Sequence, residues 1–97
     1  MSTKQVSLNE CYTQQKKGVL TKQVSDEVVI IDMKKGIYHG LNPVGVQIWQ
    51  QLDGQHRLSQ IVEQVAASYA EVDKRVIETD TLSLVQVLLD NELVLAS

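Results

Sequence analysis

The sequence predicts an α+β fold in which a three-stranded antiparallel meander precedes three helices, as in a winged helix-turn-helix domain. Three short runs rich in β-branched residues lie between residues 19 and 41, and turn-forming residues join them. From residue 43 onward, apolar residues recur at helical spacing. The chain has 97 residues, of which 43% are hydrophobic and 22% charged, so a single globular domain is expected.

The expected strands cover residues 19–24, 28–31 and 37–41. The middle strand is β-branched throughout, which suits a strand covered on both faces. Residues 33–36 form a hairpin loop that ends at Gly36, a residue free to adopt positive φ. Short connections of this kind predict a meander whose third strand lies at an edge.

The expected helices are marked by their caps. Asn42 is a good N-cap and Pro43 is favoured in the first turn, so a helix begins there and ends before Gly54. Asp73 is an N-cap for the last helix, whereas Arg57 marks the start of the middle helix poorly. The helices are expected at residues 43–53, 58–70 and 74–91.

The third helix carries two apolar strips. A broad arc that includes Ile77 and Leu84 suits a single core. Val76 and Val87 lie on a second strip, together with Asp80 and Ser83. This second strip either packs on the sheet or stays partly open as the wall of a groove.

Residues 1–17 are polar and rich in Gln and Lys, so a flexible segment or at most one irregular strand is expected there. Residues 1–35 hold six lysines and four acidic residues, and residues 36–97 hold three basic and eight acidic residues. Charge is therefore uneven along the chain. No apolar run is long enough for a signal peptide or a membrane span, and Cys11 has no second cysteine to pair with. These features predict a cytoplasmic protein that does not bind a membrane.

The sequence contains no set of reactive groups that predicts catalysis. Cys11 lies in the polar N-terminal segment without a neighbour that lowers a thiol pKa, and His56 lies in a solvated turn. His39 is expected as a half-buried strand residue or as a ligand contact. No phosphate loop, metal-ligand spacing or acid–base pair is present. We therefore expect no enzyme activity, no catalytic residue, no metal and no cofactor.

Two kinds of binding protein remain. A winged helix that reads DNA needs a basic third helix, but Lys74 and Arg75 are outnumbered there by acidic residues, so nucleic acid is not the expected partner. A peptide-binding module needs an open strand edge. Residues 37–41 carry no proline and no Asp, Glu, Lys or Arg, so they can accept an added strand.

Residues 19–95 resemble the PqqD-like family, the recognition elements for ribosomally made and modified peptides (RiPPs). The resemblance rests on Tyr-x-x-Leu-Asn from Tyr38 to Asn42, on Ile48-Trp49, and on Leu-Asp-Gly from Leu52 to Gly54. It implies a recognition domain over residues 18–97 that binds a precursor's leader peptide as an added strand on the third strand, against the third helix. The peptide-binding residues that it implies are Ile37, Tyr38, His39, Gly40, Val76, Asp80, Ser83 and Val87.

The chain is most similar to the stand-alone domains of lasso-peptide biosynthesis, an antibiotic pathway type. This likeness implies a separate leader peptidase or another maturation enzyme as partner. A PqqD-type peptide chaperone that serves a radical SAM enzyme in cofactor biosynthesis is the alternative. Glu92 departs from the family, which more often has Gly at this helix end, so Asn91 is expected to take the left-handed position.

Overall fold

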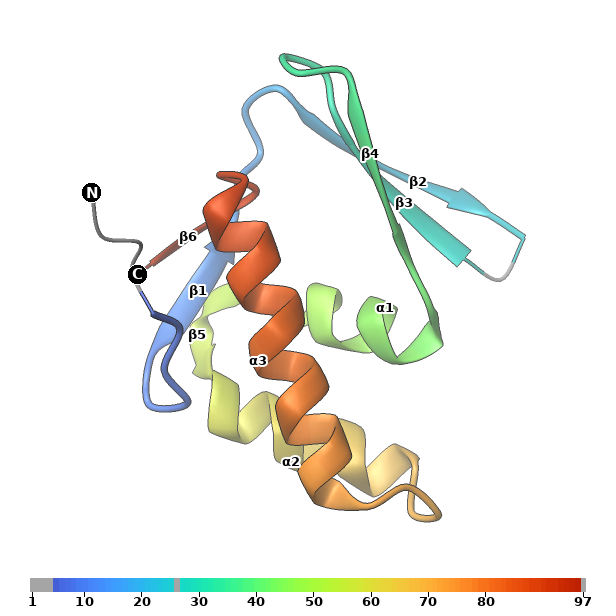
Figure 1. The fold of residues 1–97 in the computed structure, drawn as a ribbon, viewed down its shortest axis with the longest axis vertical. Helices are drawn as coiled ribbons and strands as arrows, with labels where there is room; N and C mark the ends of the chain where they lie inside the picture. The colour runs from blue at the N-terminus through green and yellow to red at the C-terminus, as the bar shows by residue number, and fades with distance from the viewer. Residues whose placement is uncertain (1–4, 26, 97) are drawn as a thin grey trace.

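The computed structural model describes residues 5–25 and 27–96, which form two three-stranded antiparallel sheets and three helices (Figure 1). The architecture is α+β, as the sequence predicts. The elements in chain order are β1 (Cys11–Gln14), β2 (Val19–Val24), β3 (Glu27–Asp32), β4 (Ile37–Leu41), α1 (Pro43–Gln50), β5 (Asp53–Arg57), α2 (Leu58–Ser68), α3 (Lys74–Asp90) and β6 (Val94–Ala96).

The expected meander is confirmed as the sheet β2-β3-β4, with β4 at an edge. A four-residue loop joins β3 to β4, and Gly36 adopts φ 67° in it. The Asp32 carboxylate accepts hydrogen bonds from the main-chain N–H groups of Lys34 (3.0 Å) and Lys35 (3.2 Å). These bonds hold the hairpin loop and therefore fix where β4 begins.

The second sheet, β5-β1-β6, was not predicted. Residues 11–14 are not a flexible segment but its central strand, and the register between Cys11 and Thr13 is irregular. For residues 1–17 the sequence allows either a flexible segment or one irregular strand, and β1 is that strand. Residues 1–4 lie outside the described residues. Tyr12 holds this strand against the core, because its side chain is 1% exposed and its hydroxyl accepts a hydrogen bond from Ser7 N–H (3.1 Å).

The helix starts follow the sequence more closely than the ends. The Asn42 side chain accepts a hydrogen bond from Gly45 N–H (2.8 Å), and Asp73 accepts one from Arg75 N–H (2.9 Å), so both predicted caps are confirmed. Helix α1 ends at Gln50, three residues before the predicted end. Gly54 is not the helix stop; it lies in β5 with φ 81°, because residues 53–57 pair with β1.

The end of α3 corrects another expectation. Asn91 has φ −97°, and Glu92 takes the left-handed conformation with φ 61°. Glu92 N–H donates to Leu89 O (3.0 Å) and Leu93 N–H donates to Leu88 O (2.8 Å), the two bonds of a Schellman motif. Leu93 is fully buried, so the turn is held by its apolar contact without a glycine.

The hydrophobic core joins the helices to both sheets. Buried side chains come from all three helices, from β3 and β4, and from β1 and β6. Leu58, Ile61 and Val65 of α2 pack in this core with Ile77 and Val85 of α3. Within the described residues, no helix is long and apolar enough to cross a membrane.

Tyr12→Ala is expected to lower the free energy of unfolding by about 3–5 kcal/mol, as for other large aromatic truncations in a core. The change removes a buried ring and the acceptor for Ser7 N–H. Urea denaturation followed by circular dichroism measures the effect. Tyr38→Ala is the matched control, because Tyr38 is 70% exposed and should change stability little. Equal stability of Tyr12→Ala and the wild type would contradict the structural role of β1.

Candidate functional site

Strand β4 has one open edge. In the sheet order β2-β3-β4, one side of β4 pairs with β3, and no described strand pairs with the other side. An open edge presents main-chain donors and acceptors that can pair with another extended chain. Because alternate residues of a strand point their main-chain groups to opposite sides, only one phase of β4 directs these groups outward.

The register of β2, β3 and β4 determines which residues of β4 belong to the outward phase. Met33 N–H donates to Gly18 O (2.9 Å), in continuation of the pairing between Val19 and Asp32. Main-chain groups of successive residues in a strand point to opposite sides. Met33 therefore faces β2, whereas Asp32 and Ile30 direct their main-chain groups toward β4.

Ile30 lies opposite His39, so the main-chain groups of His39 are directed back toward β3. The residues in the other phase, Tyr38 and Gly40, direct their N–H and C=O groups to the open edge. The sequence left this phase undetermined. The structure thus separates the four predicted β4 residues into an inward and an outward main-chain set.

The side chains of β4 alternate as well. Leu41 is buried, and because alternate residues of a strand share a face, Ile37 and His39 lie on the same face of the sheet as Leu41. Their cross-strand partners on that face are the buried Asp32 and Ile30 of β3. The Tyr38 side chain points to the other, solvent-facing side, and Gly40, which has no side chain, lies in the same phase. Ile37 and His39 therefore contribute side chains on the helix-facing side, and Tyr38 and Gly40 contribute main-chain groups.

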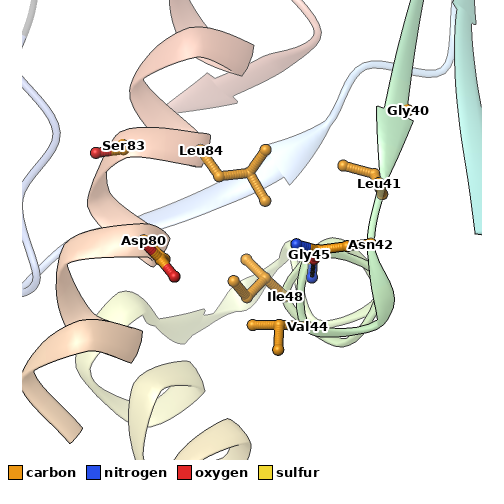
Figure 2. A pocket seen from close by; sticks show the side chains of 9 residues that line it. All are labelled: Gly40, Leu41, Asn42, Val44, Gly45, Ile48, Asp80, Ser83 and Leu84. Atoms are coloured by element: carbon orange, nitrogen blue, oxygen red, sulfur yellow. Dashed lines mark hydrogen bonds between the residues drawn. The ribbon is translucent and has the colours of Figure 1, made fainter. Parts of the chain in front are cut away.

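A cavity of about 270 Å³ lies where β4 meets α1 and faces α3 (Figure 2). Figure 2 shows Leu41 and Leu84 pointing toward each other across it, and Val44 and Ile48 forming the α1 side. The residues that line it are Gly40, Leu41, Asn42, Val44, Gly45, Ile48, Asp80, Ser83 and Leu84. The cavity is therefore apolar at its base and polar on the α3 side.

Of the predicted residues, Gly40, Asp80 and Ser83 line this cavity together. Val76 lines a neighbouring shallow hollow of about 250 Å³ that Asp80 shares. Val87 lines neither hollow, but it is 46% exposed on the same strip of α3, and Val76 is 49% exposed. The second strip is thus open and does not pack on the sheet.

Sequence reasoning did not assign Leu41, Val44, Ile48 and Leu84 to the site. Their periodicity indicates core positions, and Leu41 and Ile48 are indeed buried. They also form the base of the cavity, because α1 continues directly from the end of β4 and α3 faces this junction (Figure 2). Periodicity alone cannot distinguish a core residue from one that lines the bottom of a groove.

His39 lies half-buried on the groove side of β4, and its Nε2 atom is buried without a hydrogen-bond partner among the described residues. A buried polar atom without a partner costs about 1–3 kcal/mol. Asp80 is the one titratable residue among the described residues that line the cavity, and no base is paired with the Ser83 hydroxyl that also lines it. The arrangement is therefore suited to contact and not to proton transfer.

The other reactive side chains lie elsewhere. Cys11 is in β1, in the second sheet. His56 is in β5, where its Nδ1 atom lies 3.0 Å from the Asp53 carboxylate. A hydrogen bond from Gln55 N–H, together with His56, lowers the pKa of Asp53. Within residues 5–25 and 27–96, no cluster of three or more His, Cys, Asp or Glu is arranged to hold a metal ion.

An open strand edge lies beside a groove with an apolar base, an arrangement that suits the binding of a peptide by strand addition. The family model described as "Coenzyme PQQ synthesis protein D (PqqD)" matches residues 27–94. The chain belongs to the PqqD family, so the resemblance drawn from the sequence is confirmed.

Two solved structures resemble the chain. "TbiB1 in Complex with the TbiA(beta) Leader Peptide" is 32% identical with a TM-score of 0.70, and the match covers 84% of this chain and 94% of that chain. "Lasso peptide synthetase B1 complexed with the leader peptide" is 26% identical with a TM-score of 0.72, and the match covers 87% of this chain and 96% of that chain. No curated protein matches the chain with significant similarity.

Family membership also bears on catalysis. Domains of the PqqD family are non-catalytic, which agrees with the expectation that this chain is not an enzyme. The alternative of DNA binding gains no support from α3. Its groove-facing strip carries the acidic Asp80 between exposed valines, and a phosphate-binding surface requires basic residues.

Proposed function

We propose that this chain is a recognition element that binds the leader peptide of a ribosomally made precursor. The single observation that carries the proposal is the open β4 edge beside an apolar groove, in a fold shared with two proteins described in complex with leader peptides. Strand addition supplies main-chain hydrogen bonds, and the groove supplies selectivity for side chains.

The proposed mode of binding follows from the two phases of β4. The leader adds a strand that pairs with the main-chain groups of Tyr38 and Gly40. Its alternate side chains then face the α3 wall, where Val76, Asp80 and Val87 are exposed. Ile37 and His39 contribute side chains from the sheet side of the groove, and Ser83 completes the α3 strip.

A groove of this kind needs little rearrangement to bind. Asn42 caps α1, and this cap fixes the angle between β4 and α1. The hairpin loop at the other end of β4 is held by the Asp32 carboxylate. Because both ends of the edge strand are fixed before binding, the peptide bears most of the ordering entropy.

The proposed partners are a precursor leader peptide and a maturation enzyme, with a separate leader peptidase of lasso-peptide biosynthesis as the first candidate. The support is that both similar structures are described with leader peptides and one is described as a lasso peptide synthetase component. A radical SAM enzyme of cofactor biosynthesis remains the second candidate, because the matching family model is described as a coenzyme synthesis protein. Neighbouring reading frames distinguish the two pathways.

Amide hydrogen exchange tests strand addition directly. A candidate leader peptide, taken from a short reading frame that adjoins the gene, is added, and exchange is expected to slow along residues 37–41 more than at the control positions Gly54 and His56. The reason is that a paired edge amide exchanges only when the added strand opens. Unchanged exchange at residues 37–41 with the peptide demonstrably bound would show that the peptide lies on the helices alone.

A further inference from the structure

Strand β4 contains a glycine that the fold does not require. Gly40 does not adopt positive φ, and a Cβ placed on it would meet no described atom within 4 Å apart from its chain neighbours. Three other glycines adopt positive φ: Gly18, Gly36 and Gly54. Gly45 is enclosed, since a Cβ there would lie 3.3 Å from the Asn42 Oδ1 atom. Because glycine is disfavoured inside a strand, Gly40 points to a reason outside the domain, such as the close approach of another chain.

Gly40 lies on the outer face of the meander, the face turned away from the core. On this face Leu20, Ile31 and Tyr38 lie opposite one another in successive strands, and Leu20 and Tyr38 are exposed. In the next row, the half-buried Val29 of β3 lies opposite Gly40. Around Gly40 the outer face is therefore apolar, and the glycine leaves an open space beside Val29 and Tyr38.

A strand added to β4 brings one residue next to this space. The main-chain groups of Gly40 are directed to the open edge, so one residue of the added strand lies directly opposite Gly40. Residues directly opposite each other in a sheet share a face. This residue therefore directs its side chain to the outer face, whether the added strand runs parallel or antiparallel to β4.

The open space suits a large apolar side chain. A side chain from the added strand must cross one strand spacing, about 4.8 Å, to lie over Gly40 and contact Val29 beyond it. Tyr38 is its diagonal neighbour, about 7–8 Å away, which aromatic side chains can span. An aromatic ring over a strand glycine also supplies the packing that the glycine lacks. A short side chain leaves the space empty.

We propose that the β4 edge reads its leader on both faces of the sheet. The leader residue opposite Gly40 carries a large apolar side chain, preferably aromatic, that lies over Gly40 on the outer face and packs on Val29 and Tyr38. Its neighbours in the leader face the α3 wall. This inference rests on the proposed function, because it requires a strand on the β4 edge, and it adds a specificity position outside the groove.

Peptides selected on the full chain test the proposal. A displayed library of random peptides of about 12 residues is used, long enough to pair along all of β4. Binders that slow amide exchange at residues 37–41 are kept, and each is alanine-scanned by fluorescence anisotropy against the wild type and Gly40→Val. At one large apolar position, alanine is expected to weaken binding to the wild type about five- to tenfold and binding to Gly40→Val less than about twofold.

The groove-facing positions of the same peptides are the internal control. Alanine there should weaken binding to both proteins equally, because Gly40→Val does not alter the groove side of β4. The position coupled to Gly40 should lie an odd number of residues from these positions, since alternate residues face opposite ways. Gly40→Ala, which adds only the Cβ, should show an intermediate preference for the large side chain.

Gln23→Val is the matched protein control, because it places the same side chain at an exposed position of β2, at the other edge of the meander, and should keep the preference. Gly40→Val should melt no lower than the wild type, because its Cβ has open space and valine favours a strand. A clear loss of stability in Gly40→Val would show that the fold itself needs the glycine and would overturn the inference.

The remaining outcomes separate this inference from the proposed function. Peptides that protect residues 37–41 but show no large apolar position coupled to Gly40 overturn the outer-face contact, while strand addition stands. A selection in which no peptide protects residues 37–41 overturns both proposals.

Discussion

Tyr38→Pro is expected to abolish leader binding in a protein that stays folded, whereas His39→Pro is expected to unfold or strongly destabilise it. Proline removes one main-chain donor and is tolerated only where a strand edge faces outward. The main-chain groups of Tyr38 point to the open edge, and those of His39 pair with Ile30 in β3. Fluorescence anisotropy with a labelled leader measures the dissociation constant, and thermal denaturation reports the fold.

Tyr38→Ala separates the two roles of this residue, because it removes the exposed ring and keeps the donor. It is expected to bind the leader far better than Tyr38→Pro does. The assigned phase is wrong if Tyr38→Pro unfolds the domain while His39→Pro remains folded. Strand addition itself is wrong if folded Tyr38→Pro binds the leader as tightly as the wild type.

Val87→Asp is expected to weaken leader binding at least tenfold, equivalent to about 1.4 kcal/mol, with little change in melting temperature. Val87 is exposed on the strip of α3 that faces the bound peptide in the proposed mode. A carboxylate there loses water when the peptide covers it, which is unfavourable unless a cation or a hydrogen-bond donor compensates for it. Isothermal titration calorimetry measures the affinity.

Two variants control for the chemistry of that change. Val24→Asp introduces the same charge at a similarly exposed valine at the end of β2 and should bind the leader normally. Val85→Asp places the charge at a fully buried position of α3 and should unfold the domain. Unfolding of Val87→Asp would show that Val87 belongs to the core and that the groove lies elsewhere.

The sequence predicts the meander and the helix starts because local interactions determine them. Val28, Ile30 and their neighbours favour a strand wherever they lie, and the Asn42 side chain reaches only three residues along the chain. Strand β1 has no such signal. The polar run from Cys11 to Gln14 is ordered by Tyr12 in the core and by strands that begin at Asp53 and Val94, so its structure depends on distant residues.

The same distinction applies to the site. The second strip of α3 can be recognised from the sequence, because Val76, Asp80, Ser83 and Val87 recur at helical spacing outside the core arc, but the sequence leaves open whether the strip packs on the sheet or stays exposed. The outward phase of Tyr38 and Gly40 was not predictable, because it depends on how β2, β3 and β4 are aligned. The sequence assigns Leu84 to the core alone, since its place in the cavity lining depends on how α3 is positioned against β4 and α1.

The pairing of β1 with β6 has a consequence for how the domain is synthesised. Tyr12 lies opposite Ala96, so completing this sheet requires contacts between residues more than 80 positions apart. A nascent chain grows from its N-terminus, so β1 meets β5 first and has its second partner only after β6 is made. Contacts so distant in sequence slow folding, because the intervening loop must close before they form. The meander β2-β3-β4, built from neighbouring segments, is therefore expected to form before the sheet β5-β1-β6.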